Sequence, residues 1–374
     1  MEKPLLIAYQ QWFFFAKKKI IENRVTFFEK QKRESTMLCA INQYGKRFIA
    51  SQAVKQEIYF CPGCRLPVIL KQGKQVRAHF AHKKSSVCQV FSEAESEEHV
   101  FLKEVFYQWL KKFAEQVEIE PYLSELAQRP DLLSENFAFE IQCSPLAYSR
   151  FIERTTNYQR KQFTVWWILS SSLINKKLLA GPKLSQLVKG ACRYDEQRHV
   201  HFWAVDRHTG KLYLYHELTL SVAQEISYRV MEWSFYTCSL TKILTNQLVS
   251  DTQIVASRAK KEIYQELDWQ LRRKQDALLQ VQEFCYMRGK HLLYLSSWIY
   301  QQSAFFFFFG TNVLVYRVLF EETLQEKRLL HYLCWREKLE DVAPEWLFPL
   351  ISKEQMYWRF FEECCDLWKK KVDN

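Results

Sequence analysis

The stretch RPDLLSENFAFEIQCS, residues 129–144, places polar groups inside an otherwise apolar strand pattern. Its second half alternates with a period of two, so Phe137, Phe139 and Ile141 fall on one face of a strand. Glu140 and Gln142 fall on the other face, between apolar neighbours. Because burying an unpaired charge is costly, an acid where the pattern predicts core needs an explanation. This face is therefore the first candidate for a functional site.

A second acid lies on the segment that precedes this strand. The order of residues predicts a β-hairpin that turns at SEN, residues 134–136. Cross-strand neighbours on one face of a hairpin lie close together. We therefore expect Asp131 beside Glu140 and Gln142.

The segments around the hairpin predict an α/β fold. Residues 93–116 carry apolar side chains at helical spacing, and residues 117–123 follow as a strand. A second helix is expected after Pro145, which suits a first helical turn. The run FTVWWILSS, residues 163–171, is typical of a strand buried on both faces. Because a helix connects it to the strand of Glu140, the two strands are expected to be parallel. The predicted order is helix, three strands, helix, strand.

Composition limits the class of protein. The chain has 374 residues, 16% of them aromatic, which allows two or three domains and excludes a disordered protein. Lys and Arg total 53 against 42 Asp and Glu, and the net charge of +11 favours an anionic partner such as nucleic acid. No stretch is apolar for long enough to span a membrane, since Arg317 interrupts the closest one, residues 304–320.

The cysteines predict one metal site. Most of the 11 are scattered singly, which with the lack of an export signal indicates reduced thiols and a cytoplasmic location. The exception is the segment of residues 59–82, where two expected strands about a turn at Gly73 would bring two Cys and two His together. That spacing predicts a structural zinc with four protein ligands: Cys61, Cys64, His79 and His82. A redox-active Cys-x-x-Cys is the main alternative, but it does not account for the histidines.

Changes in the residue pattern along the chain predict its domains. Residues 1–36 are interpreted as a possible upstream extension, because an alternating strand pattern begins only at Met37. Residues 37–90 form a zinc-ribbon-like module and residues 91–175 the α/β core. The C-terminal domain, residues 176–374, is expected to be a β-hairpin at 200–218 followed by mostly helices.

The C-terminal hairpin contains four histidines. No cysteine or acid pattern accompanies them, so we expect exposed strand and turn residues and no second metal site. They are His199, His201, His208 and His216.

In their succession these segments resemble the CoiA competence-protein family. The resemblance rests on MLCAINQYGK, YFCPGC, RAHFAH, SEEHVFLKEVFYQWL, RPDLL, FEIQCSP and ERTTNYQRKQFTVWWIL, which cover about residues 37–170 in order. The element order, with one acid before Glu-x-Lys or a variant of it, also resembles the PD-(D/E)xK nuclease core. This likeness implies that residues 91–175 are a PD-(D/E)xK nuclease-like domain. Beyond residue 170 only the general residue pattern is similar to the family.

The resemblance also implies roles for single residues. Asp131 and Glu140 would hold a divalent cation, and their hard oxygens suit Mg²⁺ or Mn²⁺. Such a cation activates water and polarises a phosphodiester. Glu98 would complete the site, with Glu95 as the alternative. The departure is Gln142, where the nuclease pattern prefers Lys, because an amide can position water but supplies no positive charge.

Neighbouring residues have supporting roles in this interpretation. His99 and Lys103 lie near Glu98 in sequence and are expected to contact phosphate. Glu153 and Arg154 are interpreted as a pair that lies on a helix surface or braces the hairpin. If no ion binds, the acids form a solvated hairpin face instead.

The family implies a competence protein that acts on incoming DNA, single-stranded or in recombination intermediates. It would work in homologous recombination during natural transformation, with the recombinase RecA as a partner. Metal-dependent DNA cleavage at Asp131 and Glu140, with Gln142 positioning water, is the first hypothesis. A catalytically inactive DNA-binding recombination mediator and a protein-interaction scaffold are the alternatives.

Overall fold

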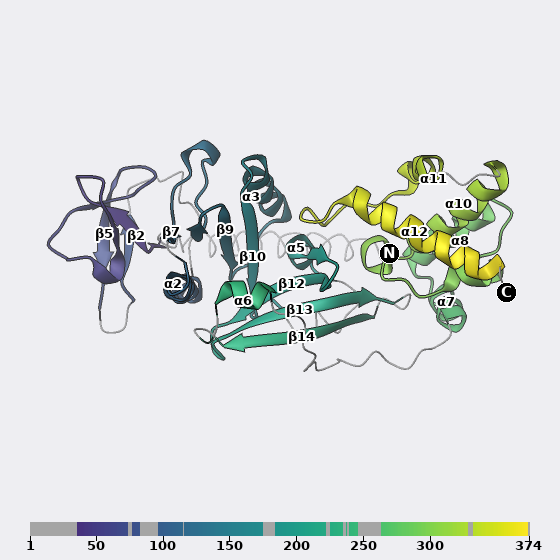
Figure 1. Cartoon of the computed structure of the whole chain (residues 1–374), viewed down its shortest axis with the longest axis horizontal. Coiled ribbons are helices and arrows are strands. Elements are labelled where there is room, and N and C mark those ends of the chain that lie inside the picture. The colour runs from purple at the N-terminus through teal and green to yellow at the C-terminus, as the bar shows by residue number, and fades with distance from the viewer. Residues whose placement is uncertain are drawn as a thin grey trace, which may run out of the picture. The chain divides into compact units, whose positions relative to one another are not determined.

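The chain folds into two compact units, residues Met1–Glu95 and Ser96–Asn374, each considered by itself (Figure 1). The structure is a computed structural model that describes residues 36–73, 77–82, 96–114, 116–174, 184–221, 225–234, 237, 239–245, 263–327 and 332–372. The extension expected at residues 1–36 lies outside the described residues, except for Thr36.

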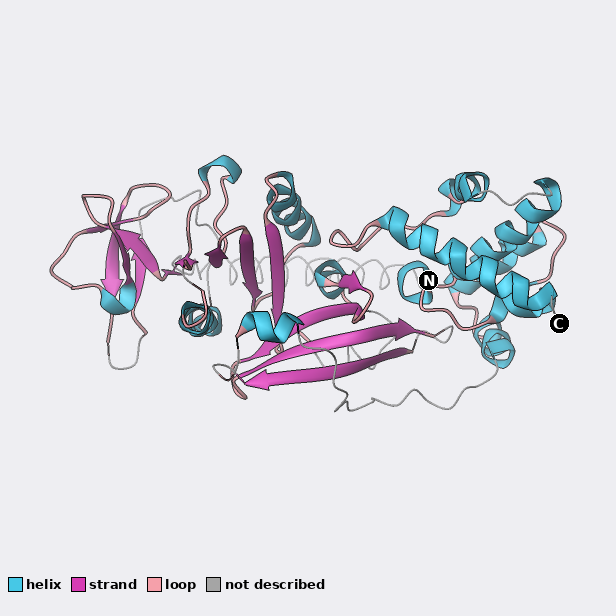
Figure 2. Cartoon of the chain, viewed as in Figure 1, coloured by secondary structure: helices cyan, strands magenta, loops and turns pink. Residues whose placement is uncertain are grey.

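The first unit contains a six-stranded antiparallel sheet, ordered β1-β6-β5-β4-β2-β3 (Figure 2). Its elements are β1 (Thr36–Met37), β2 (Cys39–Ile41), β3 (Arg47–Ile49), the short 3₁₀ helix η1 (Ala50–Gln52), β4 (Tyr59–Phe60), β5 (Pro67–Lys71) and β6 (His79–His82). The first predicted hairpin is present as β2 and β3, and Gly45 has the positive φ of +78° that its turn requires. Tyr59 and Phe80 meet in the small core with ring centroids 4.9 Å apart.

The second unit is built on a mixed sheet, ordered β14-β13-β12-β10-β9-β8-β7, with β11 paired to β12. Its strands are β7 (Glu118–Ile119), β8 (Leu132–Ser134), β9 (Phe137–Gln142), β10 (Thr164–Ser170), β11 (Arg193–Asp195), β12 (His199–Asp206), β13 (Lys211–Leu220) and β14 (Ile226–Ser234). As predicted, β10 runs parallel to β9, and it is also parallel to β12. The helix, three strands, helix and strand expected from the sequence are α2, β7, β8, β9, α3 and β10.

Two helices lie beside the acidic hairpin. The α2 helix (Glu97–Lys111) begins at Ser96, whose side chain accepts a hydrogen bond from the His99 N–H and caps it. The α3 helix (Tyr148–Arg160) packs Phe151 onto Trp167 of β10, with ring centroids 4.3 Å apart. The adjacent Trp166 points to the opposite face and meets Phe139 and Trp203. Both faces of β10 are therefore packed, as its apolar run predicts.

The sheet continues past the domain boundary expected at residue 175. Because β12 pairs with β10, the strands of the C-terminal hairpin extend the same sheet that carries Glu140. The segment around β14 was expected to be helical, and that prediction was wrong. Its alternating Ile226, Tyr228 and Val230 instead form a strand on β13, where Tyr228 meets Tyr215.

The remaining described elements of the second unit are helical, as predicted for its C-terminal part. The remaining elements are α5 (Gln186–Ala191), α6 (Leu240–Thr245), α7 (Ile263–Arg272), α8 (Asp276–Tyr286), α9 (Phe306–Phe309), α10 (Asn312–Lys327), α11 (Tyr332–Lys338), α12 (Lys353–Val372) and the 3₁₀ turns η2 (Ser124–Leu126), η3 (Leu292–Tyr294), η4 (Ser297–Tyr300) and η5 (Glu340–Val342). The apolar run at 304–320 is buried within α9 and α10, where Arg317 pairs with Glu363 of α12. Within the described residues, no helix has the length and apolarity that a membrane crossing needs.

Two of the four C-terminal histidines are buried, contrary to expectation. His216 belongs to the buried face of β13 together with Leu214, and His201 lies on β12. Burial lowers the pKa of His201 to about 4, and its Nδ1 is 2.9 Å from the His199 carbonyl oxygen. The sequence pattern of the hairpin did not show that this face of the sheet is covered.

The buried His201 predicts a loss of stability in acid. An unfolded imidazole binds a proton below about pH 6.5, whereas this one stays neutral until about pH 4. The free energy of unfolding should therefore fall by about 2 kcal/mol between pH 7 and pH 5 on account of this group. Denaturant unfolding of wild type and His201→Gln at both pH values measures it. Equal pH dependence in the two proteins would contradict the assignment.

Gly190 marks a close contact in the same core. A Cβ at this position would lie 2.8 Å from Cε1 of Phe151, a buried ring with little room to move. We expect Gly190→Ala to lower the free energy of unfolding by about 1–3 kcal/mol through overpacking. Gly73→Ala is the control, since an added Cβ there meets nothing within 4 Å. Equal unfolding midpoints for the two variants would refute this packing.

Candidate functional site

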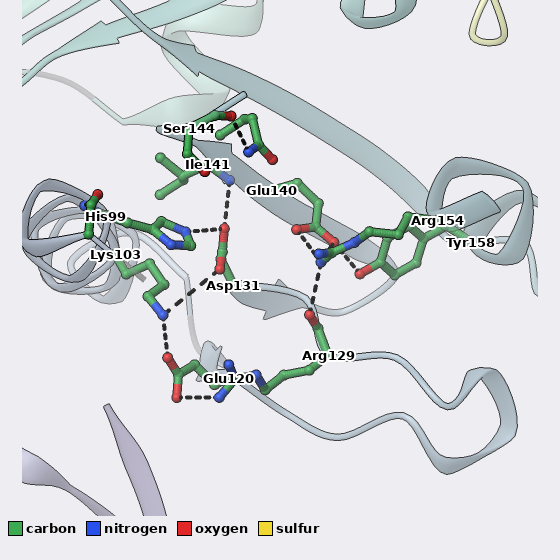
Figure 3. Close-up of polar contacts among 12 residues, drawn as sticks. His99, Lys103, Glu120, Arg129, Asp131, Glu140, Ile141, Ser144, Arg154 and Tyr158 are labelled. Atoms are coloured by element: carbon green, nitrogen blue, oxygen red, sulfur yellow. Dashed lines mark hydrogen bonds and ion pairs between the residues drawn. The ribbon is translucent and has the colours of Figure 1, made fainter. Parts of the chain in front are cut away.

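The two acids of the hairpin are neighbours across strands. Leu132 pairs with Phe139, and the Asp131 N–H donates to the Phe139 carbonyl at 3.1 Å. This register places Asp131 opposite Glu140, as the sequence predicts, and both residues are buried. Figure 3 shows that their side chains engage different helices, with Asp131 toward α2 and Glu140 toward α3.

Asp131 forms two hydrogen bonds and one longer ion pair. Its Oδ2 lies 2.9 Å from His99 Nε2 and accepts the Ile141 N–H at 2.7 Å, and its Oδ1 lies 4.0 Å from Lys103 Nζ. Burial alone would raise the pKa of Asp131, but His99, Lys103 and the Ile141 N–H lower it well below its usual range. Asp131 is thus a stabilised carboxylate.

A third carboxylate, Glu120, lies in the same network. Lys103 has no exposed surface and donates to Glu120, whose other oxygen accepts from Arg129 Nη1 at 3.1 Å. Burial opposes the ionisation of Glu120, yet the charges of Arg129 and Lys103 lower its pKa. Breaking one such buried pair typically costs about 3–5 kcal/mol, so this network fixes the base of the hairpin.

Glu140 is clamped by α3. Arg154 Nη2 lies 2.5 and 2.6 Å from its two oxygens, and the Tyr158 hydroxyl donates to Oε1 at 2.5 Å. Burial, with the nearby charge of Asp131, raises the pKa of Glu140 to about 7 although Arg154 opposes the shift. The charge of Asp131 therefore acts on Glu140. The environments of the two acids differ, because the pKa of Asp131 is lowered and that of Glu140 is raised.

The other expected site residues have hydrogen-bond partners outside this pair. Glu98 accepts a hydrogen bond from Ser170, at the end of β10. Gln142 donates from Nε2 to the Ser144 carbonyl at 2.6 Å. Lys161, which follows α3, pairs with Glu125 at 2.7 Å. Within the described part of the chain, no three acids bring their oxygens within 4.8 Å of one another.

Sequence reasoning underestimated the cations of the site. His99 and Lys103 were expected to contact phosphate, but they bind Asp131. Glu153 and Arg154 were interpreted as a pair that lies on the helix surface or braces the hairpin. Glu153 lies on the surface and meets Arg150 at 2.8 Å, whereas Arg154 braces the hairpin through Glu140 and the Arg129 carbonyl. A signal was present: His99 and Lys103 are four residues apart on one helix, and so are Arg154 and Tyr158 on the other. Residues at this spacing share a helix face.

The first unit contains a group of side chains whose spacing could hold a metal ion. The ligand atoms of Cys61, Cys64 and His82 all lie within 4.8 Å of one another, with Cys64 Sγ 3.3 Å from His82 Nε2. The Cys64 N–H points to Cys61 Sγ at 3.5 Å, and Arg65 takes the positive φ of 61° that closes the tight turn. Two thiolates and an imidazole suit Zn²⁺. The turn joins β4 to β5 and precedes no helix, which disfavours the redox alternative.

His79 lies outside that group. The Nδ1 atom of His79 is 2.9 Å from the Arg77 carbonyl oxygen. In the register of β5 and β6, His79 lies opposite Lys71, whereas His82 lies opposite Val68. Both histidines belong to β6, where residues three apart point to opposite faces. The predicted four-ligand set is therefore present as three residues without His79.

Two models of one protein family match this chain. Residues 42–91 match the family model described as Competence protein CoiA, N-terminal domain, and residues 95–248 match Competence protein CoiA, nuclease-like domain. Together the matches cover more than half of the chain. The chain belongs to the CoiA family.

One curated relative supports this membership of the CoiA family. Competence protein CoiA of Bacillus subtilis (strain 168) is 32% identical over 130 residues. The match spans 34% of this chain and 35% of that relative, so it covers about a third of each protein. No solved structure matches significantly. The nuclease-like match includes α2, the acidic hairpin, α3 and β10, and it runs on through β12 to β14, in agreement with the continuous sheet.

Proposed function

We propose that this CoiA-family chain acts on DNA taken up during natural transformation, through a PD-(D/E)xK-like core that binds a divalent cation and cleaves phosphodiesters. The observation that carries this proposal is the pair of buried carboxylates, Asp131 and Glu140, opposite each other in register. They lie between α2 and α3 in the nuclease-like domain. The net charge of +11 suits a polyanionic partner.

The donor chemistry of the site fits Mg²⁺ or Mn²⁺. Asp131 and Glu140 supply carboxylate oxygens, the hard ligands that these ions prefer. When bound there, the cation would activate water and stabilise charge on the phosphate. His99 and Lys103 orient Asp131 in its ionised form, and Arg154 and Tyr158 orient Glu140.

One observation favours the second function, a DNA-binding recombination mediator without hydrolysis. The three buried carboxylates Glu120, Asp131 and Glu140 face an equal number of basic side chains. Those cations are Lys103, Arg129 and Arg154. The network is therefore charge-compensated by protein alone. RecA as a partner stays a prediction from the family resemblance.

Labelled single- and double-stranded DNA, incubated with the protein in Mg²⁺ or Mn²⁺, separates the two functions. Cation-dependent cleavage supports hydrolysis. Tight, salt-sensitive binding without cleavage supports the mediator. If neither occurs at near-physiological salt, the protein-interaction scaffold is the remaining hypothesis.

For the first unit we propose a structural zinc held by Cys61, Cys64 and His82. Cys61 and His82 are buried, so an ion there would tie the turn after β4 to β6. A site inside a β module stabilises its fold and has no direct part in DNA cleavage.

A further inference from the structure

The acid pair lacks positive charge at the position where the nuclease pattern prefers lysine. Gln142 occupies it, and its amide donates to the Ser144 carbonyl. Among the contacts of the described residues, none joins Gln142 to Glu140. Gln142 therefore supplies neither a charge nor a hydrogen bond to that carboxylate. The charge has to come from elsewhere in the fold.

Arg154 brings a positive charge to the same carboxylate from α3. A single nitrogen, Nη2, contacts both oxygens of Glu140 at 2.5 and 2.6 Å and also donates to the Arg129 carbonyl at 3.1 Å. The guanidinium lies 5.8 Å from the Trp167 ring centroid, and the Arg154 side chain is only 13% exposed. An arginine in this setting stays charged at any physiological pH.

This contact occupies the oxygens that a divalent cation would use. Oε1 already accepts from both Arg154 and Tyr158, and the guanidinium charge beside Oε2 repels a divalent cation, so the Arg154 contact opposes cation binding at Glu140. A guanidinium displaced by the cation would be a largely buried charge in need of another anion. A DNA phosphate, entering beside the cation, is an anion of suitable geometry, because guanidinium groups bind phosphate through paired donors.

We propose that Arg154 is the residue that supplies positive charge to the DNA phosphate, and that it holds Glu140 until cation and phosphate bind together. This inference rests on the proposed function. It makes Arg154 the coupling element between two ligands, since each ligand removes the obstacle to the other. Tyr158, which donates to Glu140 from one turn further along α3, keeps the carboxylate in place when Arg154 leaves.

Binding of Mn²⁺, followed by electron paramagnetic resonance of the free ion, tests this coupling through a readout other than cleavage. Wild type, Arg154→Gln and Arg154→Lys are titrated with and without a short single-stranded oligonucleotide. Arg160→Ala is the matched control, because Arg160 is an exposed residue of the same helix. The glutamine keeps a donor and most of the side-chain volume, and thermal unfolding verifies that each variant folds.

For wild type and Arg160→Ala we expect the oligonucleotide to tighten Mn²⁺ binding about tenfold or more. Arg154→Gln should bind Mn²⁺ about tenfold more tightly than wild type without DNA, and the oligonucleotide should then add little. Arg154→Lys should restore the dependence on DNA. A merely structural arginine would give the opposite sign, with weaker Mn²⁺ binding in the variant.

The alternative results are distinguishable. Equal Mn²⁺ affinities for wild type and folded Arg154→Gln overturn the role of Arg154 and leave the proposed cation site standing. Failure of every protein to bind Mn²⁺, with or without DNA, overturns the cation site and this inference with it.

Discussion

Glu140→Gln is expected to slow DNA cleavage in Mg²⁺ or Mn²⁺ by about 100–1000-fold, because the charge stabilisation from a bound cation is worth several kcal/mol. The amide keeps the shape of the side chain and can still accept from Tyr158, but it is a poor ligand for a hard cation. Asp131→Asn should have an effect of similar size, since the two carboxylates are opposite each other in the hairpin. Initial rates on labelled oligonucleotides measure both variants.

The matched control is Glu153→Gln, an exposed acid on the same helix as Arg154. It should cleave at the wild-type rate. Loss of the Arg154–Glu140 ion pair can also weaken the fold, so the unfolding temperature of each variant is needed beside its rate. Cleavage that survives in folded Glu140→Gln and Asp131→Asn would place the chemistry elsewhere in the chain.

Replacing Cys61 and Cys64 by Ser is expected to remove about one zinc per chain and to unfold the first unit. Zinc in small structural sites contributes about 10–16 kcal/mol, more than a small core can replace. The core of this unit is indeed small, centred on Tyr59, Val68 and Phe80. Metal analysis of the purified protein and limited proteolysis between residues 36 and 82 are the two readouts.

Two further variants make this test specific. Cys39→Ala removes a buried thiol of the same sheet that lies outside the metal group, and it should retain zinc. His79→Ala should also retain zinc, since His79 is not in the group, whereas His82→Ala should lose it. Zinc retained by the double Cys61 and Cys64 variant would contradict the site.

The acidic hairpin was predictable because its signals are local. Strand alternation fixes which side of β9 carries Glu140, and the turn at residues 134–136 fixes which residue of the preceding segment lies opposite. The clamps were not predicted, because contact between Lys103 and Glu120 depends on how α2 docks on the sheet. Even so, the i,i+4 pairs His99 and Lys103, and Arg154 and Tyr158, show in the sequence that polar groups share the inner face of each helix.

Other differences have separate physical causes. Residues 226–234 form a strand because their alternating β-forming residues pair with the edge of β13, and the helical prediction overlooked this alternation. The error at His79 was avoidable. Once residues 79–82 are assigned to a strand, His79 and His82 point to opposite faces and do not share an ion without a distortion of that strand. The two expectations, strand and joint ligation, were inconsistent with each other.

The central claim is that the carboxylates of Asp131 and Glu140 hold a hard cation when DNA is bound. Crystals of the protein grown with Mn²⁺ and a short oligonucleotide, measured for anomalous scattering from manganese, test it most directly. The account predicts an anomalous peak beside both carboxylates, with Arg154 moved from Glu140 to a DNA phosphate. No peak at this place, with Arg154 still on Glu140 and DNA bound, would contradict it.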